Sequence, residues 1–86
     1  MESINIRMLV ERDGILYSKI TNQPYTGSVI YLYDEPEDIY GYGQTMGEGT
    51  LKNGKREGDF FWYGYDGQLE EIVTWKDNEE IESIKF

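Results

Sequence analysis

The 86-residue sequence contains no cysteine, no histidine and only two prolines. Without cysteine, disulfides, zinc–thiolate sites and cysteine nucleophiles are excluded. Without histidine, the chain lacks the usual general base near neutral pH and the commonest metal ligand. Uncharged apolar runs are far shorter than the roughly 18–20 residues that a membrane-spanning helix needs. We therefore expect no cofactor, no metal site and no transmembrane segment.

The amino-terminal stretch MESINIRMLVERDG also lacks a basic segment followed by a long apolar run. It does not have the pattern of a signal peptide, so we expect a cytoplasmic protein. A chain of this length forms a single domain, residues 1–86. Such a small domain buries only about 60% of the surface that its unfolded chain exposes, and we expect modest stability.

Acidic residues outnumber basic residues by 17 to 8, which gives a formal net charge of −9. The charge is concentrated in the run 34–38 and in the last third of the chain. A field of this sign repels nucleic acid and anionic lipid and favours basic partners. The competing explanation is solubility alone, because a net charge away from zero opposes association in general.

Ten glycines and thirteen aromatic residues in so short a chain indicate a repeat. The spacing from Gly43 to Asn53 recurs from Gly67 to Asp77, which gives a period of 24 residues. A partial earlier copy begins at 24–27 and carries a seven-residue insertion near 34–40. The last copy is the weakest, and we predict that the chain ends in a terminal cap strand over 79–86, because the outer face of a last repeat must meet water.

Local signals favour β-hairpins throughout the chain. Four dipeptides supply the residues of tight turns: Asp13-Gly14, Asn53-Gly54, Asp66-Gly67 and Asp77-Asn78. Stretches rich in β-branched and aromatic residues predict strands over 15–19, 27–33, 47–52, 58–65, 68–76 and 80–86. Residues 4–11 fit either a helical turn or an edge strand, and we favour the strand. The predicted fold class is all-β, an antiparallel meander of hairpins, and both faces of 27–33 and 60–63 are apolar enough that either could be the inner one.

Several of these segments resemble a known repeat. They are Tyr25-Thr26-Gly27, Gly43-Gln44, Lys52-Asn53-Gly54-Lys55-Arg56-Glu57-Gly58 and Tyr65-Asp66-Gly67-Gln68-Leu69. Together they resemble the MORN-repeat variant, and Arg12–Tyr17 resembles the lead-in strand of YwqK-type antitoxin-like proteins. The resemblance covers residues 12–78, which it implies are a MORN-like repeat region. The resemblance implies hairpins stacked into one elongated, curved sheet, and a binding role as a scaffold, a lipid-associated module or an antitoxin. The chain departs from the pattern at the insertion, at Gly64 and at 77–79.

Carboxylate pairs such as Glu70/Glu71 do not predict catalysis. Adjacent residues on a strand point to opposite faces, so they cannot form the facing pair that acid–base chemistry needs. The acidic run 34–38 lacks the ligand spacing and the glycine of a calcium loop. The glycine-rich run 41–49 lacks the lysine of a phosphate-binding loop. We therefore predict that the protein is not an enzyme.

The sequence predicts a non-enzymatic protein-binding module, an antitoxin- or immunity-type inhibitor that sets an acidic face against a basic partner. Two alternatives stay open: an acidic mimic of nucleic acid that inhibits a nucleic-acid enzyme, and a structural or membrane-peripheral repeat scaffold. We expect no direct nucleic-acid binding and no membrane binding, while an edge strand near 80–86 leaves room for a homodimer. The acidic insertion is either a contact loop or a neutral one. The candidate partner-binding residues are Asp34, Glu35, Glu37, Asp38, Tyr40, Tyr42, Glu70, Glu71, Glu79 and Glu80.

Overall fold

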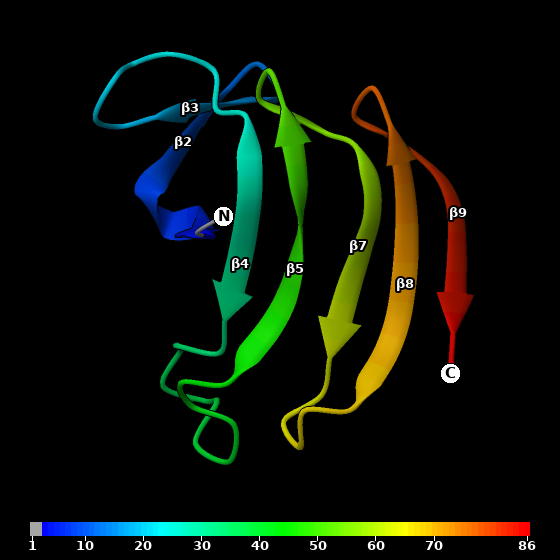
Figure 1. The fold of residues 1–86 in the computed structure, drawn as a ribbon. Helices are drawn as coiled ribbons and strands as arrows, with labels where there is room; N and C mark the ends of the chain where they lie inside the picture. Colours follow the sequence, from blue (N-terminus) through cyan, green and yellow to red (C-terminus); the bar gives the residue numbers. More distant parts are fainter. Residues whose placement is uncertain (1–2) are drawn as a thin grey trace.

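The computed structural model describes residues 3–86, which form strands and one short 3₁₀ helix (Figure 1). The elements are β1 (Ile4–Asn5), η1 (Ile6–Met8), β2 (Leu9–Arg12), β3 (Ile15–Ser18), β4 (Gly27–Leu32), β5 (Thr45–Lys52), β6 (Lys55–Arg56), β7 (Gly58–Tyr63), β8 (Leu69–Lys76) and β9 (Glu79–Lys85). The main sheet has the order β1-β4-β5-β7-β8-β9, with β6 paired to β5. In the described part of this sheet, only the short β1–β4 pair is parallel; the other pairs are antiparallel. The predicted all-β fold class is confirmed.

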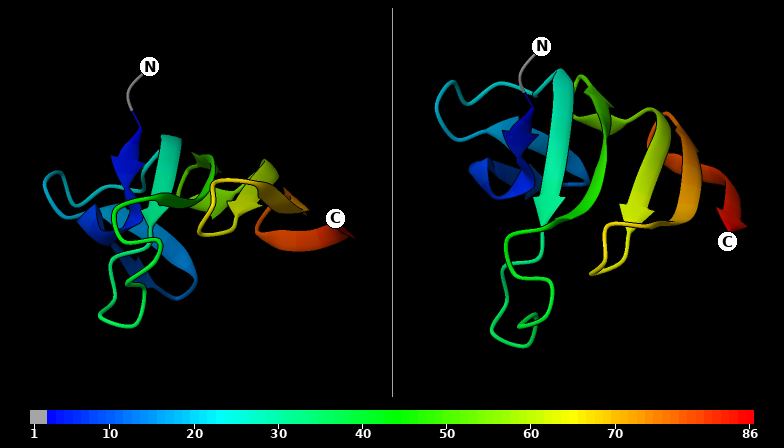
Figure 2. Two further views of the ribbon diagram at one scale, coloured as in Figure 1. Left: turned by 90° about the horizontal axis from the view of Figure 1, so that it is seen from below. Right: turned by 60° about the horizontal axis from the view of Figure 1, so that its bottom comes forward.

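A separate hairpin of β2 and β3 covers part of the sheet. Figure 2 shows that the sheet is curved and that this hairpin lies against one face of it, which we call the inner face. The predicted strand over 15–19 is present as β3, but it pairs with β2 and does not extend the main sheet. Leu9 and Leu16 of the hairpin are buried in the same cluster as Val29 of β4, so apolar contact explains the position of the hairpin.

The inner face carries the hydrophobic core. Phe60 is fully buried, and Trp62, two residues further along β7, packs against the same cluster. Two glycines of β5 make room for these rings: a Cβ on Gly49 would lie 2.5 Å from the Phe60 ring, and one on Gly47 would lie 2.3 Å from the Trp62 ring. The buried members of the core are Leu9, Leu16, Val29, Leu51 and Phe60.

The period of 24 residues has a structural counterpart. Strand β8 begins and ends 24 residues after β5. The turn after β5 has positive φ at Asn53 (52°) and Gly54 (78°), and the turn after β8 has positive φ at Asp77 (49°) and Asn78 (69°). The tight turns predicted at these two dipeptides are confirmed.

The amino-terminal segment combines the two structures considered for it. Residues 4–5 form an edge strand, 6–8 form a turn of 3₁₀ helix, and β2 begins at Leu9. The side chain of Asn5 caps the helix by accepting a hydrogen bond from the Arg7 amide at 2.9 Å. Among residues 3–86, no helix is long and apolar enough to cross a membrane.

Candidate functional site

The insertion forms the connection between β4 and β5, residues 33–44, and has a defined structure of its own (Figure 1). Two backbone bonds close its base: the Tyr33 amide donates to the Gln44 carbonyl at 3.0 Å, and the Gly43 amide donates to the Tyr33 carbonyl at 2.8 Å. Inside the loop, the Asp38 amide donates to the Glu35 carbonyl at 2.9 Å, and the Asp38 carbonyl accepts from the Gly41 amide at 3.0 Å. These bonds fix the path of the chain, since an ordered loop must satisfy its backbone groups.

Tyr65, in the turn between β7 and β8, holds the loop against that turn. Its hydroxyl donates to Asp38 Oδ1 at 2.8 Å. Its ring packs edge-on against Tyr33, with ring centroids 4.6 Å apart. A Cβ on Gly41 would lie 2.3 Å from the Tyr65 ring, so only glycine allows the loop to approach so closely. The loop 33–44 and the turn 64–68 therefore form one surface, which we call the acidic end.

Arg7 of η1 holds the other side of the loop. Its guanidinium donates to both carboxylate oxygens of Asp34, at 2.6 and 2.7 Å, and to Glu35 at 2.6 Å. The bonds to Asp34, and then those to Glu35, raise the pKa of Arg7 above its usual range. The arginine side chain is 59% exposed, so solvent screens these pairs and they contribute little to stability. Their effect is to orient the loop and to neutralise part of its charge.

Among residues 3–86, Glu37 is the acidic side chain of the loop that makes no ion pair or side-chain hydrogen bond. Next to it the loop exposes large apolar and aromatic side chains. Ile39 is 71% exposed, Tyr40 86% and Tyr42 66%. We call these three residues the loop tip. The acidic end is therefore a fixed scaffold that presents an apolar tip beside unpaired carboxylate charge.

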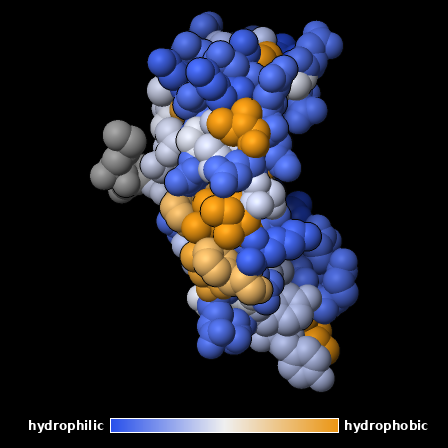
Figure 3. All heavy atoms as spheres, turned by 90° about the vertical axis from the view of Figure 1, so that its right-hand side faces the viewer, coloured by the Kyte–Doolittle hydropathy of each residue, from blue (hydrophilic) through white to orange (hydrophobic). Residues whose placement is uncertain are grey.

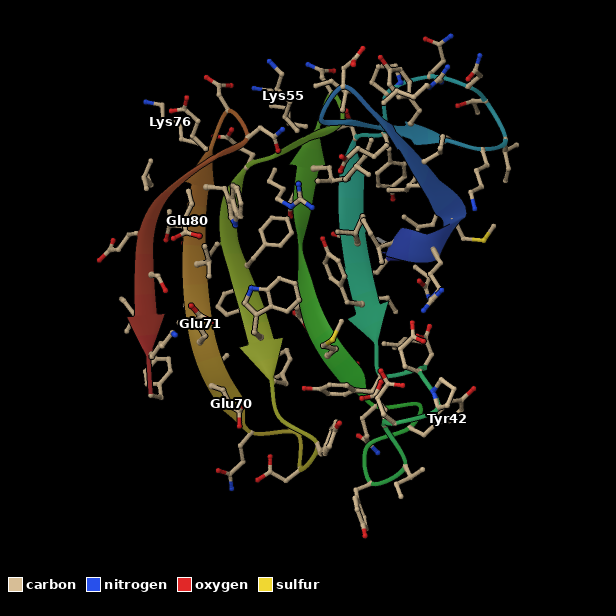
Figure 4. All side chains as sticks on the ribbon, turned by 180° about the vertical axis from the view of Figure 1, so that it is seen from behind. Tyr42, Lys55, Glu70, Glu71, Lys76 and Glu80 are labelled. Atoms are coloured by element: carbon tan, nitrogen blue, oxygen red, sulfur yellow. The ribbon has the colours of Figure 1, made fainter. Side chains whose placement is uncertain are left out.

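The ten predicted contact residues do not lie together. Glu70 belongs to the acidic end, because its carboxylate lies at the β7–β8 turn, 2.6 Å from where a Cβ of Gly64 would be. Glu71 accepts a hydrogen bond from the Ser83 hydroxyl at 2.5 Å, further along the sheet. Glu79 and Glu80 pair with the last residues of β8, toward the opposite end of the sheet from Tyr42 (Figure 4). The structure thus brings together the loop residues and Glu70 and separates the other three.

Sequence reasoning missed several residues of the acidic end. Ile39 lies between two predicted residues, and a lone apolar side chain beside an acidic run does not by itself indicate a contact. Tyr33, Tyr65 and Asp66 fit the strands and turns that the sequence predicts there, so their residue types do not indicate a site. Nothing in the sequence indicates that Arg7 belongs to the site, because it lies 27 residues from its partner Asp34.

The tyrosines of the acidic end lie in a negative field. Burial, followed by the charges of Glu70, Asp38 and Asp66, raises the pKa of Tyr33 above its ordinary value of 10.0. The hydrogen bond to Asp38 is the largest cause that raises the pKa of Tyr65. In addition to burial at Tyr33, the two shifts share one cause, because a neighbouring carboxylate disfavours the tyrosinate anion.

Alkaline pH is expected to destabilise the folded protein through these tyrosines. A folded-state pKa above 10.0 contributes stability that is present below pH 10 and lost as the pH rises through the folded-state value. Asp38→Asn should lower the pKa of Tyr65, because the amide cannot repel a tyrosinate. Titration of tyrosinate absorbance in the wild type, Asp38→Asn and Tyr65→Phe checks this; identical curves for the wild type and Asp38→Asn would contradict it.

The cavity beside the loop is small. It lies between η1 and the loop, has a volume of about 190 Å³, and is lined by residues that include Arg7, Tyr31 and Asp34. Pockets for small ligands usually have volumes of roughly 300–1,000 Å³. Within the described residues, no three acidic side chains are grouped as metal ligands would be. A second cavity, of about 290 Å³, lies at the base of the loop and is lined by residues that include Gln44 and Gly67. Both cavities lie below the usual volume of a ligand pocket, so the exposed side chains are the more prominent feature of the acidic end.

Comparison with protein families, with curated proteins and with solved structures finds no significant match to this chain. The resemblance to the MORN-repeat variant therefore stays a prediction. The functional proposal rests instead on the geometry of the acidic end.

Proposed function

We propose that this protein is a non-enzymatic protein-binding module that engages a basic partner protein through its acidic end. The observation that supports this most directly is the loop tip: Ile39, Tyr40 and Tyr42 are exposed, although the loop that carries them is fixed by hydrogen bonds and by packing. Exposed aromatic side chains on a fixed backbone are typical of binding hot spots. Because the loop is already ordered, less conformational entropy is lost on binding.

The charge around the loop tip determines which partner fits. Glu37 lies within the loop, and Asp66 and Glu70 lie close enough to raise the pKa of Tyr33. Carboxylates at the rim of an aromatic centre favour a positively charged partner and accelerate its association. The net charge of −9 acts in the same direction over a longer range.

Inhibition is the form of binding that we propose, in the manner of an antitoxin or immunity protein. A loop tip that covers a basic functional surface of its partner would block that surface without any chemistry of its own. This differs from an acidic mimic of nucleic acid, whose carboxylates would occupy the phosphate positions of the partner. The exposed apolar tip favours the first form, since a mimic of phosphates needs no aromatic centre.

Replacement of both tip tyrosines, Tyr40→Ser with Tyr42→Ser, is expected to weaken partner binding at least about tenfold, the loss of one modest hot spot. The matched control is Ile20→Ser, which removes an equally exposed apolar side chain (80%) from the connection at the other end of β4. Both proteins and the wild type are immobilised, and partners are captured from lysate of the native host. Affinity for the recovered partner is then measured by calorimetry at low and high salt.

Four outcomes decide the proposal. A basic partner that binds the wild type and the control, binds the tyrosine variant weakly and dissociates at high salt supports it. Equal affinity for all three proteins would exclude the loop tip as the binding site. Displacement of the partner by duplex DNA would favour the nucleic-acid mimic, and sedimentation of the protein with anionic vesicles would favour a membrane-peripheral scaffold.

A further inference from the structure

Strand β9 forms an uncovered edge of the main sheet. All seven of its residues are exposed, and among residues 3–86 β8 is its only neighbour in the sheet. At the opposite edge, β1 pairs with the middle of β4. Figure 3 views the molecule from the β9 side and shows an apolar band crossing a mostly hydrophilic surface. Three apolar residues at this edge are strongly exposed: Ile81 (61%), Ile84 (46%) and Phe86 (74%).

The two halves of β9 differ in how well they are protected against pairing. The first half carries Glu79, Glu80 and Glu82, and its pairing with β8 is interrupted by a register shift between Thr74 and Trp75. Charges and bulges are the usual means by which natural edge strands avoid each other. The second half, 83–85, and Phe86 directly after it pair regularly with β8 and have one charged side chain, that of Lys85. This half can accept another strand.

The direction of the backbone groups in this half follows from one hydrogen bond. The Phe86 amide donates to the Glu70 carbonyl at 2.9 Å, so its backbone points toward β8. In an antiparallel pair, residues that point toward the neighbouring strand alternate with residues that point away. Ile84 therefore points its backbone toward β8, while Ser83 and Lys85 direct their N–H and C=O groups outward. Two residues of this half thus present donors and acceptors to solvent.

We propose that this edge binds a second copy of the chain, antiparallel, with the two-fold axis at Ile84. Ser83 of each copy then faces Lys85 of the other, and their outward backbone groups form hydrogen bonds. The two Ile84 side chains meet in a non-hydrogen-bonded pair, where opposed side chains come closest. Because Phe61, Ile72 and Ile84 are direct neighbours across β7, β8 and β9, their apolar row continues into the same row of the second copy.

Charge excludes one register, and apolar pairing selects among the others. An axis at Glu82 would set two glutamates opposite each other. An axis at Ser83 would set Ile84 opposite Glu82, so the two apolar rows would not meet. With the axis at Ile84, the two Ile84 side chains face each other and no two acidic side chains are opposed. A closed dimer requires a self-complementary surface, and 82–86 has this property. The inference is independent of the proposed function, since loop 33–44 lies between other strands.

The test compares Ser83→Pro with Ser83→Ala. Proline is tolerated on an edge strand where its missing N–H would face solvent, so Ser83→Pro removes a bond across the dimer and none to β8. Both variants lose the hydrogen bond from the Ser83 hydroxyl to Glu71, so the comparison isolates the backbone N–H. Sedimentation equilibrium over increasing concentration should give about twice the 10.1 kDa chain mass for the wild type and Ser83→Ala. Dimerisation of Ser83→Pro should be at least about tenfold weaker.

Several results would overturn the proposal. A wild type that stays monomeric at every concentration excludes a second copy as the occupant. Equal dimerisation of the proline and alanine variants places the contact elsewhere. Circular dichroism establishes that Ser83→Pro is folded; if it is not, Ile84→Thr replaces it, with Ile81→Thr as the control from the protected half. Weakening by both threonine variants alike would also contradict the register.

Discussion

Phe60→Ala is expected to lower the free energy of unfolding by about 3–5 kcal/mol, as for other large-to-small changes at buried aromatic positions. Phe60 is the largest fully buried side chain among the described residues. Its ring lies 6.5 Å from that of Trp62 and 6.3 Å from that of Trp75, and Gly49 leaves room for it on β5. The surrounding sheet cannot collapse into the space, because backbone hydrogen bonds fix the strands. A cavity would remain.

The loss expected for Phe60→Ala is large compared with the total free energy of unfolding. Native domains are stable by about 5–15 kcal/mol, and small ones lie toward the lower limit. Phe61→Ala is the matched control, because Phe61 is the next residue on β7, points to the outer face and is only half-buried. Urea denaturation followed by tryptophan fluorescence measures both variants. Equal losses of unfolding free energy in the two variants would show that the outer face contributes as much to stability as the inner face.

The strands and turns were predictable because their signals are local. Alternating aromatic and β-branched residues gave all six expected strands to within a few residues. The dipeptide Asn53-Gly54 predicted its turn because both residues tolerate the positive φ that they adopt. In such segments the residue type and the backbone conformation are linked within two to eight residues, and no distant contact is needed.

The inner face could not be assigned in the same way. Both faces of β4 are apolar, with Val29 on one side and Ile30 on the other. What makes Val29 the buried residue is the β2–β3 hairpin, which packs on that face through Leu9 and Leu16. The position of the hairpin depends on contacts between segments far apart in the sequence, and no single segment encodes it.

In the candidate site, too, local features were predictable from the sequence and contacts between distant segments were not. The acidic insertion was recognisable from composition and from its break in the period. The bonds that turn it into a fixed surface were not, since Arg7 reaches Asp34 and Tyr65 reaches Asp38 across 27 residues each. Together with the bond from Arg7 to Glu35, they occupy three of the four acidic side chains of the run. The proposed binding therefore depends more on the exposed loop tip than on the charges of the run.

Gly54→Ala is expected to destabilise the protein by about 2–4 kcal/mol. One part of the loss is backbone strain, about 1 kcal/mol, because alanine disfavours the φ of 78° at this position. The other part is steric: the new Cβ would lie 2.5 Å from Ile15 Cγ2 and 2.7 Å from the Leu16 carbonyl oxygen. Overpacking of this kind costs about 1–3 kcal/mol. Backbone atoms cannot move aside as a flexible side chain can.

Gly67→Ala separates the two contributions. Gly67 has a similar φ of 83°, but nothing lies within 4 Å of its Cβ position, so this variant should lose only the strain. Gly54 also joins the hairpin to the sheet: its carbonyl accepts from the Leu16 amide at 2.9 Å, and its amide donates to the Tyr25 carbonyl at 2.8 Å. Hydrogen exchange should therefore increase at Leu16 in Gly54→Ala and stay unchanged there in Gly67→Ala. Equal destabilisation by the two variants would mean that strain alone accounts for the effect and that the hairpin tolerates displacement from the sheet.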